Sequence, residues 1–147
     1  MAVDRGVPYL FPLASSEITF LPHSPLKFAL NALSADHLRA AIAFAHNKLG
    51  KRRFGILVQD DETGVQALRA AEEQLKVHGL TLLEKTSYKR GETNLAAQIA
   101  RLKAANLDML VLGTIVRETA AAAIEAKAQG WAVEMIIPWA VVNAVVQ

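Results

Sequence analysis

The sequence predicts an α/β fold in three layers, with a mostly parallel sheet covered by helices on both faces. Short apolar runs alternate along the chain with segments of helical period, and the links between them are short. The apolar runs have little polar alternation, which is typical of strands that are buried on both faces. The clearest unit is the run at 54–59, followed by an acidic loop at 60–64 and an amphipathic segment that stops at Gly79.

The remaining elements follow from the same patterns. We expect the strands of the sheet at 54–59, 80–86, 108–113 and 132–137. Their spatial order is 2-1-3-4 if the first crossover runs to one side and the others run to the opposite side. A further helix precedes the first strand, with Ser34 as its N-cap and Gly50 as its stop signal.

Residues 1–25 are predicted to form an N-terminal arm, and residues 26–147 to form the α/β lobe. Prolines are concentrated in the arm, which breaks regular structure there. Residues 9–11 form a short apolar run that predicts a strand. A weak alternation at 26–30 predicts an edge strand where the lobe begins.

The composition excludes several classes of function. A chain of 147 residues with 52% hydrophobic and 20% charged residues is typical of one globular unit with a sizeable core. The net charge is only +2 and the basic residues are scattered, so we expect no nucleic-acid partner. There is no cysteine, which excludes disulfides, thiolate metal sites and thiol catalysis.

An acidic cluster, Asp60 to Glu62, follows the first strand of the sheet. It resembles the magnesium-binding end of a response-regulator receiver domain. Such a domain also needs an aspartate at the end of the third strand, where this chain has Gly113, and a lysine after a later strand, which is missing. The favoured interpretation is therefore that these acids open the next helix and complement its positive N-terminus.

No other pattern predicts catalysis, a cofactor or a metal site. Glycine-rich phosphate loops are missing, and Ser15 has no histidine and carboxylate recognisably placed to activate it. Two of the histidines, His46 and His78, are expected at the surface near helix C-termini. The histidines as a set, which lack the spacing of metal ligands, are His23, His37, His46 and His78. We expect the chain not to be an enzyme.

Several segments of the chain occur in an order and spacing that are typical of one protein family. They are 6–17 (GVPYLFPLASSE), 26–28, 53–64, 103–113, 118–120 and 129–131. Together they resemble the type I periplasmic binding proteins over about residues 6–137. Within that family the resemblance is to the leucine/isoleucine/valine-binding substrate proteins of ABC transporters.

The resemblance implies a two-lobed receptor that closes on a small solute without chemistry. This chain holds the second lobe, of flavodoxin-like or Rossmann-like type, and the arm is the last piece of the first lobe. The family implies an ABC-transporter permease as a partner and a periplasmic location. Because the N-terminus lacks the apolar core of a signal peptide, the cytoplasm remains the alternative location.

The family's ligand-binding positions can be carried over residue by residue. They fall on Ala14 and Ser15 in the arm, on Thr63 and the pair Ile115 and Val116 after the first and third strands, and near Trp139 after the fourth. The family has aromatic residues at the positions of Thr63, Ile115 and Val116, and an acid near Trp139. The resemblance implies a branched-chain amino acid as the solute. The side chains of Ile115, Val116 and Trp139 suggest a related apolar or aromatic solute, and a preference for leucine would contradict that hypothesis.

A homodimer is expected from the apolar residues of the arm and of 139–147, which face water in an isolated lobe. Exchange of the arm between protomers is a simple way to bury them. The competing outcome is an arm that folds back and covers the C-terminal segment of its own lobe. The alternative function is a stand-alone flavodoxin-like module, a degenerate receiver-like domain that associates with itself and binds no ligand.

Overall fold

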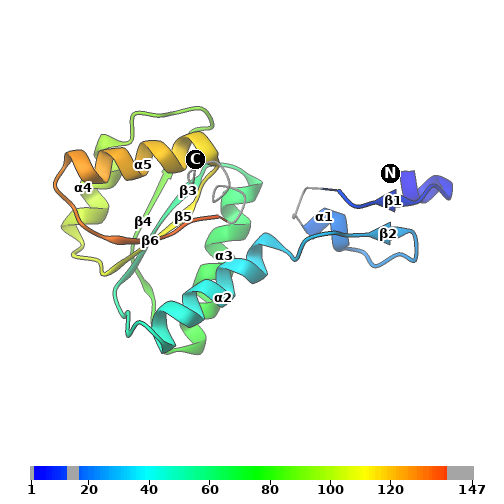
Figure 1. The fold of residues 1–147 in the computed structure, drawn as a ribbon, viewed down its shortest axis with the longest axis horizontal. Coiled ribbons are helices and arrows are strands. Elements are labelled where there is room, and N and C mark those ends of the chain that lie inside the picture. Colours follow the sequence, from blue (N-terminus) through cyan, green and yellow to red (C-terminus); the bar gives the residue numbers. More distant parts are fainter. Residues whose placement is uncertain (1, 13–16, 139–147) are drawn as a thin grey trace.

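The computed structural model describes residues 2–12 and 17–138, which form an arm and an α/β lobe (Figure 1). The elements in chain order are η1 (Ala2–Arg5), β1 (Tyr9–Leu10), α1 (Glu17–Phe20), β2 (Lys27–Phe28), α2 (Ser34–Asn47), β3 (Phe54–Gln59), α3 (Glu62–Val77), β4 (Leu82–Tyr88), α4 (Ala96–Ala104), β5 (Met109–Gly113), α5 (Val116–Ala128) and β6 (Glu134–Ile136). Within these ranges no helix is both long and apolar enough to cross a membrane.

The lobe is built on one parallel sheet in the order β4-β3-β5-β6. This is the predicted order 2-1-3-4, so that prediction is confirmed. In the register, Gln59 lies beside Tyr88 and Val58 lies beside Gly113. The carboxyl ends of β3, β4 and β5 therefore meet at one edge of the sheet.

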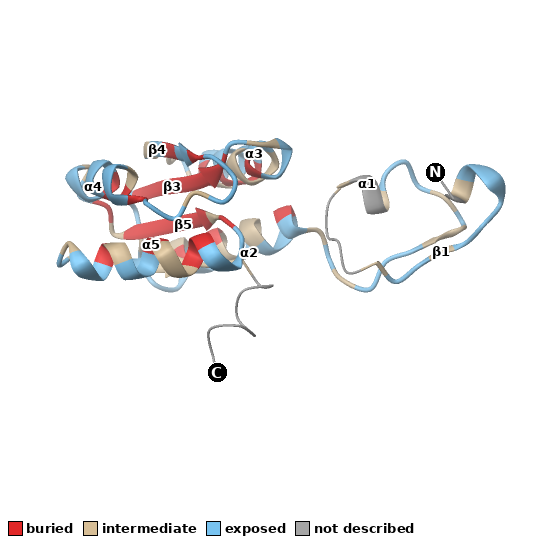
Figure 2. Cartoon of the chain, turned by 90° about the horizontal axis from the view of Figure 1, so that it is seen from above, coloured by how far each residue is buried: buried red, intermediate tan, exposed pale blue. Residues whose placement is uncertain are grey.

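Helices cover both faces of the sheet, which confirms the three-layer α/β/α fold (Figure 1). Leu57 and Leu110 pack in a buried cluster with side chains of α4 and α5. Ile56 and Val111 pack in a second cluster with side chains of α2 and α3. Because side chains alternate along a strand, β3 and β5 are buried on both faces, as Figure 2 shows.

Helix ends follow the predicted signals with one correction. Helix α3 begins after the N-cap Asp61 and ends before Gly79, whose φ of 69° suits a residue without a side chain. Helix α2 begins at Ser34 itself, with Leu33 in the N-cap position and no side-chain cap. The prediction of Ser34 as N-cap is therefore wrong by one position.

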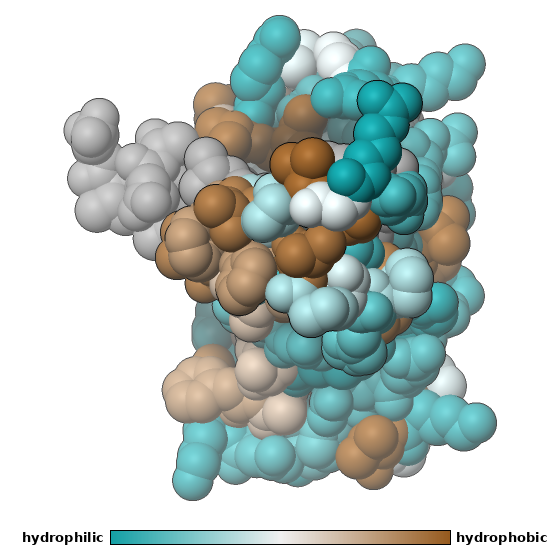
Figure 3. Space-filling view, turned by 90° about the vertical axis from the view of Figure 1, so that its right-hand side faces the viewer, coloured by the Kyte–Doolittle hydropathy of each residue, from teal (hydrophilic) through white to brown (hydrophobic). Residues whose placement is uncertain are grey.

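The described residues up to Phe28 extend away from the lobe, and the word arm refers to them from here on (Figure 1). They carry a two-stranded parallel sheet in which Tyr9 pairs with Lys27. The strand predicted near 26–30 therefore exists as β2, but it pairs with β1 in the arm and not with the sheet of the lobe. Leu10 and Phe11 are each 58% exposed, as the sequence predicts, whereas Tyr9 and Phe20 are half-buried. Apolar side chains gather on this end of the molecule (Figure 3). The large hydrophobic residues that the arm and its connection to the lobe expose are Val7, Leu10, Phe11, Leu21, Phe28 and Leu30.

The C-terminal ends of α2 and α3 are joined by two stacked histidines. The ring centroids of His46 and His78 are 4.1 Å apart, and the rings are inclined by 19°. Both residues are half-buried, so the prediction that they are surface residues is only partly right. Partial burial lowers the pKa of His78, and the nearby charges of His46 and Arg52 lower it further.

Candidate functional site

The candidate site is the edge of the sheet where β3, β4 and β5 end, because ligands of open parallel sheets collect at the carboxyl ends of the strands. Strand β3 leads through Asp60 and Asp61 into α3, and β5 leads through Thr114 and Ile115 into α5. These two strands are neighbours in the sheet. The N-termini of α3 and α5 therefore lie along the same edge.

Asp61 organises the loop between β3 and α3. One carboxylate oxygen accepts a hydrogen bond from the backbone N–H of Gly64 at 3.1 Å, and the other accepts from the side-chain amide of Gln59. The backbone N–H of Asp60 donates to the carbonyl of Tyr88 at 2.8 Å. The prediction that these acids open the helix is confirmed for Asp61. In the described part of the chain, no group of three or more metal-ligating side chains is placed to hold an ion.

Two glycines let α3 pack directly on the strand ends. A Cβ atom at Gly64 would lie 1.7 Å from the carbonyl oxygen of Gln59. A Cβ atom at Gly113 would lie 2.9 Å from the Cβ of Ala67 and 3.0 Å from a methyl group of Val58. The first turn of α3, which carries Thr63, is thereby fixed close to the ends of β3 and β5.

A buried tyrosine, Tyr88, lies at the carboxyl end of β4, next to the loop between β3 and α3. Tyr88 is 2% exposed, and its hydroxyl donates to the side-chain oxygen of Gln59 at 3.4 Å. Burial raises the pKa of Tyr88 to about 12; a hydrogen bond from the backbone of Ile115 lowers it, and the charges of Glu118 and Asp61 raise it. Tyr88 is therefore a neutral donor that ties β4 to β3, and it is not poised to act as a base.

Glu118, in the first turn of α5, is also buried, with 1% of its surface exposed. One carboxylate oxygen accepts a hydrogen bond at 3.2 Å from the backbone N–H of Gly91, in the loop after β4. The other oxygen has no partner among the described residues. Thr119, the next residue of α5, shares a hydrogen bond of 2.5 Å between its hydroxyl group and that of Thr114. Glu118 thus connects the loop after β4 to the N-terminus of α5.

The predicted ligand-binding residues of the lobe lie on the outer side of this scaffold. Thr63 is exposed in the first turn of α3, and Ile115 and Val116 are 40% and 41% exposed at the start of α5. The structure therefore places these residues at one edge of the sheet. The other predicted residues, Ala14, Ser15 and Trp139, lie outside the described residues, as does the C-terminal segment 139–147.

Sequence reasoning missed the buried polar scaffold formed by Gln59, Tyr88, Thr114, Glu118 and Thr119. Glu118 entered the sequence analysis only as part of segment 118–120 of the family resemblance. Their position in the sequence could have indicated them, because polar residues that directly follow a buried strand lie at the edge of a parallel sheet where ligands bind. Side chains of this scaffold hold the loops, and the exposed residues beside them remain available for a ligand.

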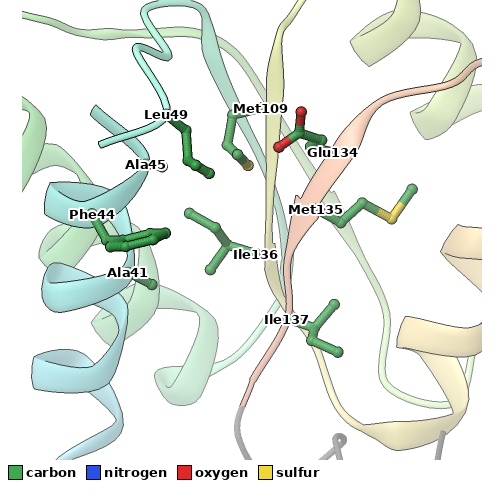
Figure 4. A pocket seen from close by; sticks show the side chains of 9 residues that line it. All are labelled: Ala41, Phe44, Ala45, Leu49, Met109, Glu134, Met135, Ile136 and Ile137. Carbon is green, nitrogen blue, oxygen red and sulfur yellow. The ribbon is translucent and has the colours of Figure 1, made fainter. Parts of the chain in front are cut away.

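A separate apolar groove lies between α2 and the edge strand β6 and has a volume of about 450 Å³ (Figure 4). Ile136 and Met109 point toward α2, whereas Met135 and Ile137 point to the opposite face of the sheet. The groove is lined by Ala41, Phe44, Ala45, Leu49, Met109, Glu134, Met135, Ile136 and Ile137. Among the described residues that line it, Glu134 is the only charged one, and Lys51 pairs with it at 2.6 Å.

Comparison with known proteins gives a family match over nearly the whole chain. The sequence profile described as "Periplasmic binding protein" matches residues 1–146. Among proteins with curated descriptions, none matches this chain.

Solved structures of the same type superpose on most of the chain. A substrate-binding periplasmic protein from Ralstonia solanacearum is 25% identical, with a TM-score of 0.78 over 91% of this chain and 37% of its own. A branched chain amino acid ABC transporter periplasmic ligand-binding protein from Burkholderia xenovorans is 11% identical, with a TM-score of 0.80 over 91% of this chain and 37% of its own. A possible leucine/isoleucine/valine-binding protein from Rhodopirellula baltica is 13% identical, with a TM-score of 0.77 over 91% and 37%.

This chain therefore spans little more than a third of the length of these structures. The fold, the order of the strands and the profile match agree with the resemblance carried by the sequence segments. The chain belongs to the periplasmic binding protein family.

Proposed function

We propose that the chain is a solute-binding lobe of a transport receptor and that it acts by binding and closure, not by catalysis. The observation that carries this proposal is the exposure of Thr63, Ile115 and Val116 at the ligand edge of the sheet, above a scaffold without an activated nucleophile. In this proposal residues 1–25 are the end of a first lobe and 26–147 are the second lobe, whose first strand, β2, pairs with β1 of the arm. Ala14, Ser15 and Trp139 contribute from the arm and from the segment after β6.

An apolar or aromatic solute fits these residues best. Ile115 and Val116 present aliphatic surface, and the hydroxyl group of Thr63 is the polar group of the described set. Two of the acids at this edge bind groups of the protein, because Asp61 caps α3 and Glu118 accepts from Gly91, whereas Asp60 and Glu62 are exposed. Apolar pockets with few polar groups select their ligands by shape and burial.

Isothermal titration calorimetry with L-leucine, L-phenylalanine and benzoate tests this proposal. We expect an aromatic ligand to bind more tightly than L-leucine. The variant Ile115→Ser should weaken binding about 10- to 100-fold, since burying a large aliphatic side chain is worth roughly 1.5–3 kcal/mol. Ile124→Ser is the matched control, because Ile124 is 69% exposed further along the same helix. A preference for L-leucine, or equal losses in the two variants, would contradict the apolar or aromatic site.

The proposed partners are the small solute and the permease of an ABC transporter, and the proposed location is the periplasm. The family supports these proposals, as do structurally similar proteins such as an amino acid ABC transporter substrate-binding protein from Pseudomonas fluorescens.

Self-association is the second candidate function, and the exposed apolar surface of the arm favours it. Leu10 and Phe28, on the two-stranded parallel sheet, are 58% and 45% exposed, and Phe11, the residue after β1, is 58% exposed. Such a sheet is marginal by itself, and parallel sheets are normally covered on both faces. A homodimer that buries the arms is therefore proposed together with the solute site, and a dimer that binds no solute is the alternative.

A further inference from the structure

An ion pair joins the arm to the lobe. The guanidinium group of Arg69, on α3, donates to a carboxylate oxygen of Glu17, the first residue of α1. In Figure 1, α1 lies at the end of the arm that is nearest the lobe, and Figure 2 agrees. The two residues are 52 positions apart, so the contact depends on how the arm is oriented and not on local chain geometry.

Other connections between the two parts are sparse in the described structure. Every extensive contact between helices and strands lies either within the arm or within the lobe. The chain passes between them once, through residues 29–33, where it is neither helix nor strand. In that passage, the buried amide nitrogen of Asn31 has no hydrogen-bond partner among residues 2–12 and 17–138. The passage therefore provides few interactions that would fix the orientation of the arm.

Both residues of the ion pair are close in sequence to the proposed site. Arg69 follows Thr63 by less than two turns of α3, which is about 9 Å along the helix. Glu17 follows Ser15 by two positions. We propose that Glu17 and Arg69 are positioning residues that hold the arm against the second lobe beside the solute site. This inference rests on the proposed function for its role, but the ion pair itself can be tested without a solute.

The strength of the pair follows from its exposure. The side chains of Arg69 and Glu17 are 51% and 33% exposed, so solvent and salt screen their attraction. Surface ion pairs of this kind shift a two-state equilibrium by between about 1.5-fold and fivefold. That shift is enough to set the preferred orientation of an arm that has few other contacts, and too small to prevent the arm from moving.

Pulsed EPR distances between the arm and the lobe test the proposal. Because the chain has no cysteine, Arg5→Cys on the arm and Lys127→Cys on α5 give two unique sites for spin labels. Labelled protein is diluted with unlabelled protein so that only distances within one molecule are measured. We expect one main distance at 50 mM NaCl, and a broader distribution with a second component at 500 mM NaCl or in Arg69→Gln.

Arg101→Gln is the matched control, because Arg101 pairs with Glu84 inside the lobe at 2.7 Å and is similarly exposed. It should leave the distribution unchanged, and the charge exchange Glu17→Arg with Arg69→Glu should restore the main distance. The inference is overturned if Arg69→Gln and the parent give the same distribution at both salt concentrations. Failure to bind any solute in calorimetry, with distances that respond to Arg69→Gln, would refute the proposed function and leave the positioning role intact.

Discussion

At the scale of single residues, Gly64 shows how closely α3 approaches β3. In an ordinary helix, replacing glycine with alanine is favourable by about 1 kcal/mol. At this position the added Cβ would lie 1.7 Å from the carbonyl oxygen of Gln59, which is backbone and cannot rotate away. We therefore expect Gly64→Ala to lower the free energy of unfolding by about 3 kcal/mol or more, because the helix must move off the strand.

Urea unfolding followed by circular dichroism measures this change. Thr63→Ala, at the exposed neighbouring position, is the control and should change stability by less than about 0.5 kcal/mol. A Gly64→Ala variant as stable as the parent would mean that α3 does not lie against the end of β3 as described.

Glu118 is the second residue that the structure singles out. Its carboxylate accepts the backbone N–H of Gly91, and both groups belong to the ligand edge. Glu118→Ala leaves that donor without its partner, so we expect a loss of about 1–3 kcal/mol in the free energy of unfolding. Glu118→Gln keeps an accepting oxygen and should lose clearly less. Urea unfolding of both variants is the measurement, and equal losses would show that the hydrogen bond to Gly91 is not what Glu118 contributes.

At the scale of elements, the stacked histidines connect the C-terminal ends of α2 and α3. The pKa of His78 is lowered in the fold from its ordinary value of 6.5, by partial burial and by the charges of His46 and Arg52. The unfolded chain therefore binds a proton more readily than the folded one. Stability from this group is fully present above pH 6.5 and is lost as the pH falls through the lowered pKa of His78.

Urea midpoints measured at pH 8, 6.5 and 5 test this dependence. We expect the midpoint of the parent to fall between pH 6.5 and 5, and to fall less in His78→Gln, where no proton can be taken up at that position. The same slope in His78→Gln and the parent would refute the role of His78.

The sheet could be predicted from the sequence because its signals are local and redundant. Residues 54–59 and 108–113 are nearly continuous apolar runs, and each is bounded by a turn signal, so β3 and β5 were placed correctly. Element ends were less certain. Strand β4 runs to Tyr88, two residues beyond the predicted end, because Tyr88 is buried at the ligand edge.

The buried polar scaffold could not be predicted because its contacts join distant parts of the chain. Tyr88 meets Gln59 across 29 positions, and Glu118 meets Gly91 across 27. No local period marks such partners, and an acid in the first turn of a helix is equally typical of an exposed residue that complements the helix dipole. Similarly, the helical period does not fix every position, since Val65 is an apolar residue of α3 that is 65% exposed.

At the scale of the whole molecule, the arm exposes apolar surface that a stable soluble protein normally covers. The exposed apolar surface of its small sheet comes from Leu10 on β1, Phe28 on β2 and Phe11, the residue after β1. Burying such side chains is worth roughly 1.5–3 kcal/mol each, before the cost of association is subtracted. We expect a two-fold dimer at micromolar protein concentration, held together by contacts of the arms.

Sedimentation equilibrium measures this association. Leu10→Asp with Phe28→Asp should weaken the dimer at least about tenfold, because each charge must be removed from water to restore the interface. Val77→Asp with Ile124→Asp is the matched control, since both residues are more exposed than those of the arm but lie on helices of the lobe. A dimer that resists the charges in the arm and also survives deletion of residues 1–25 would place the contact elsewhere on the lobe. A single monomeric species in the parent would contradict the dimer, and it would mean that the arm's apolar side chains are covered within one chain.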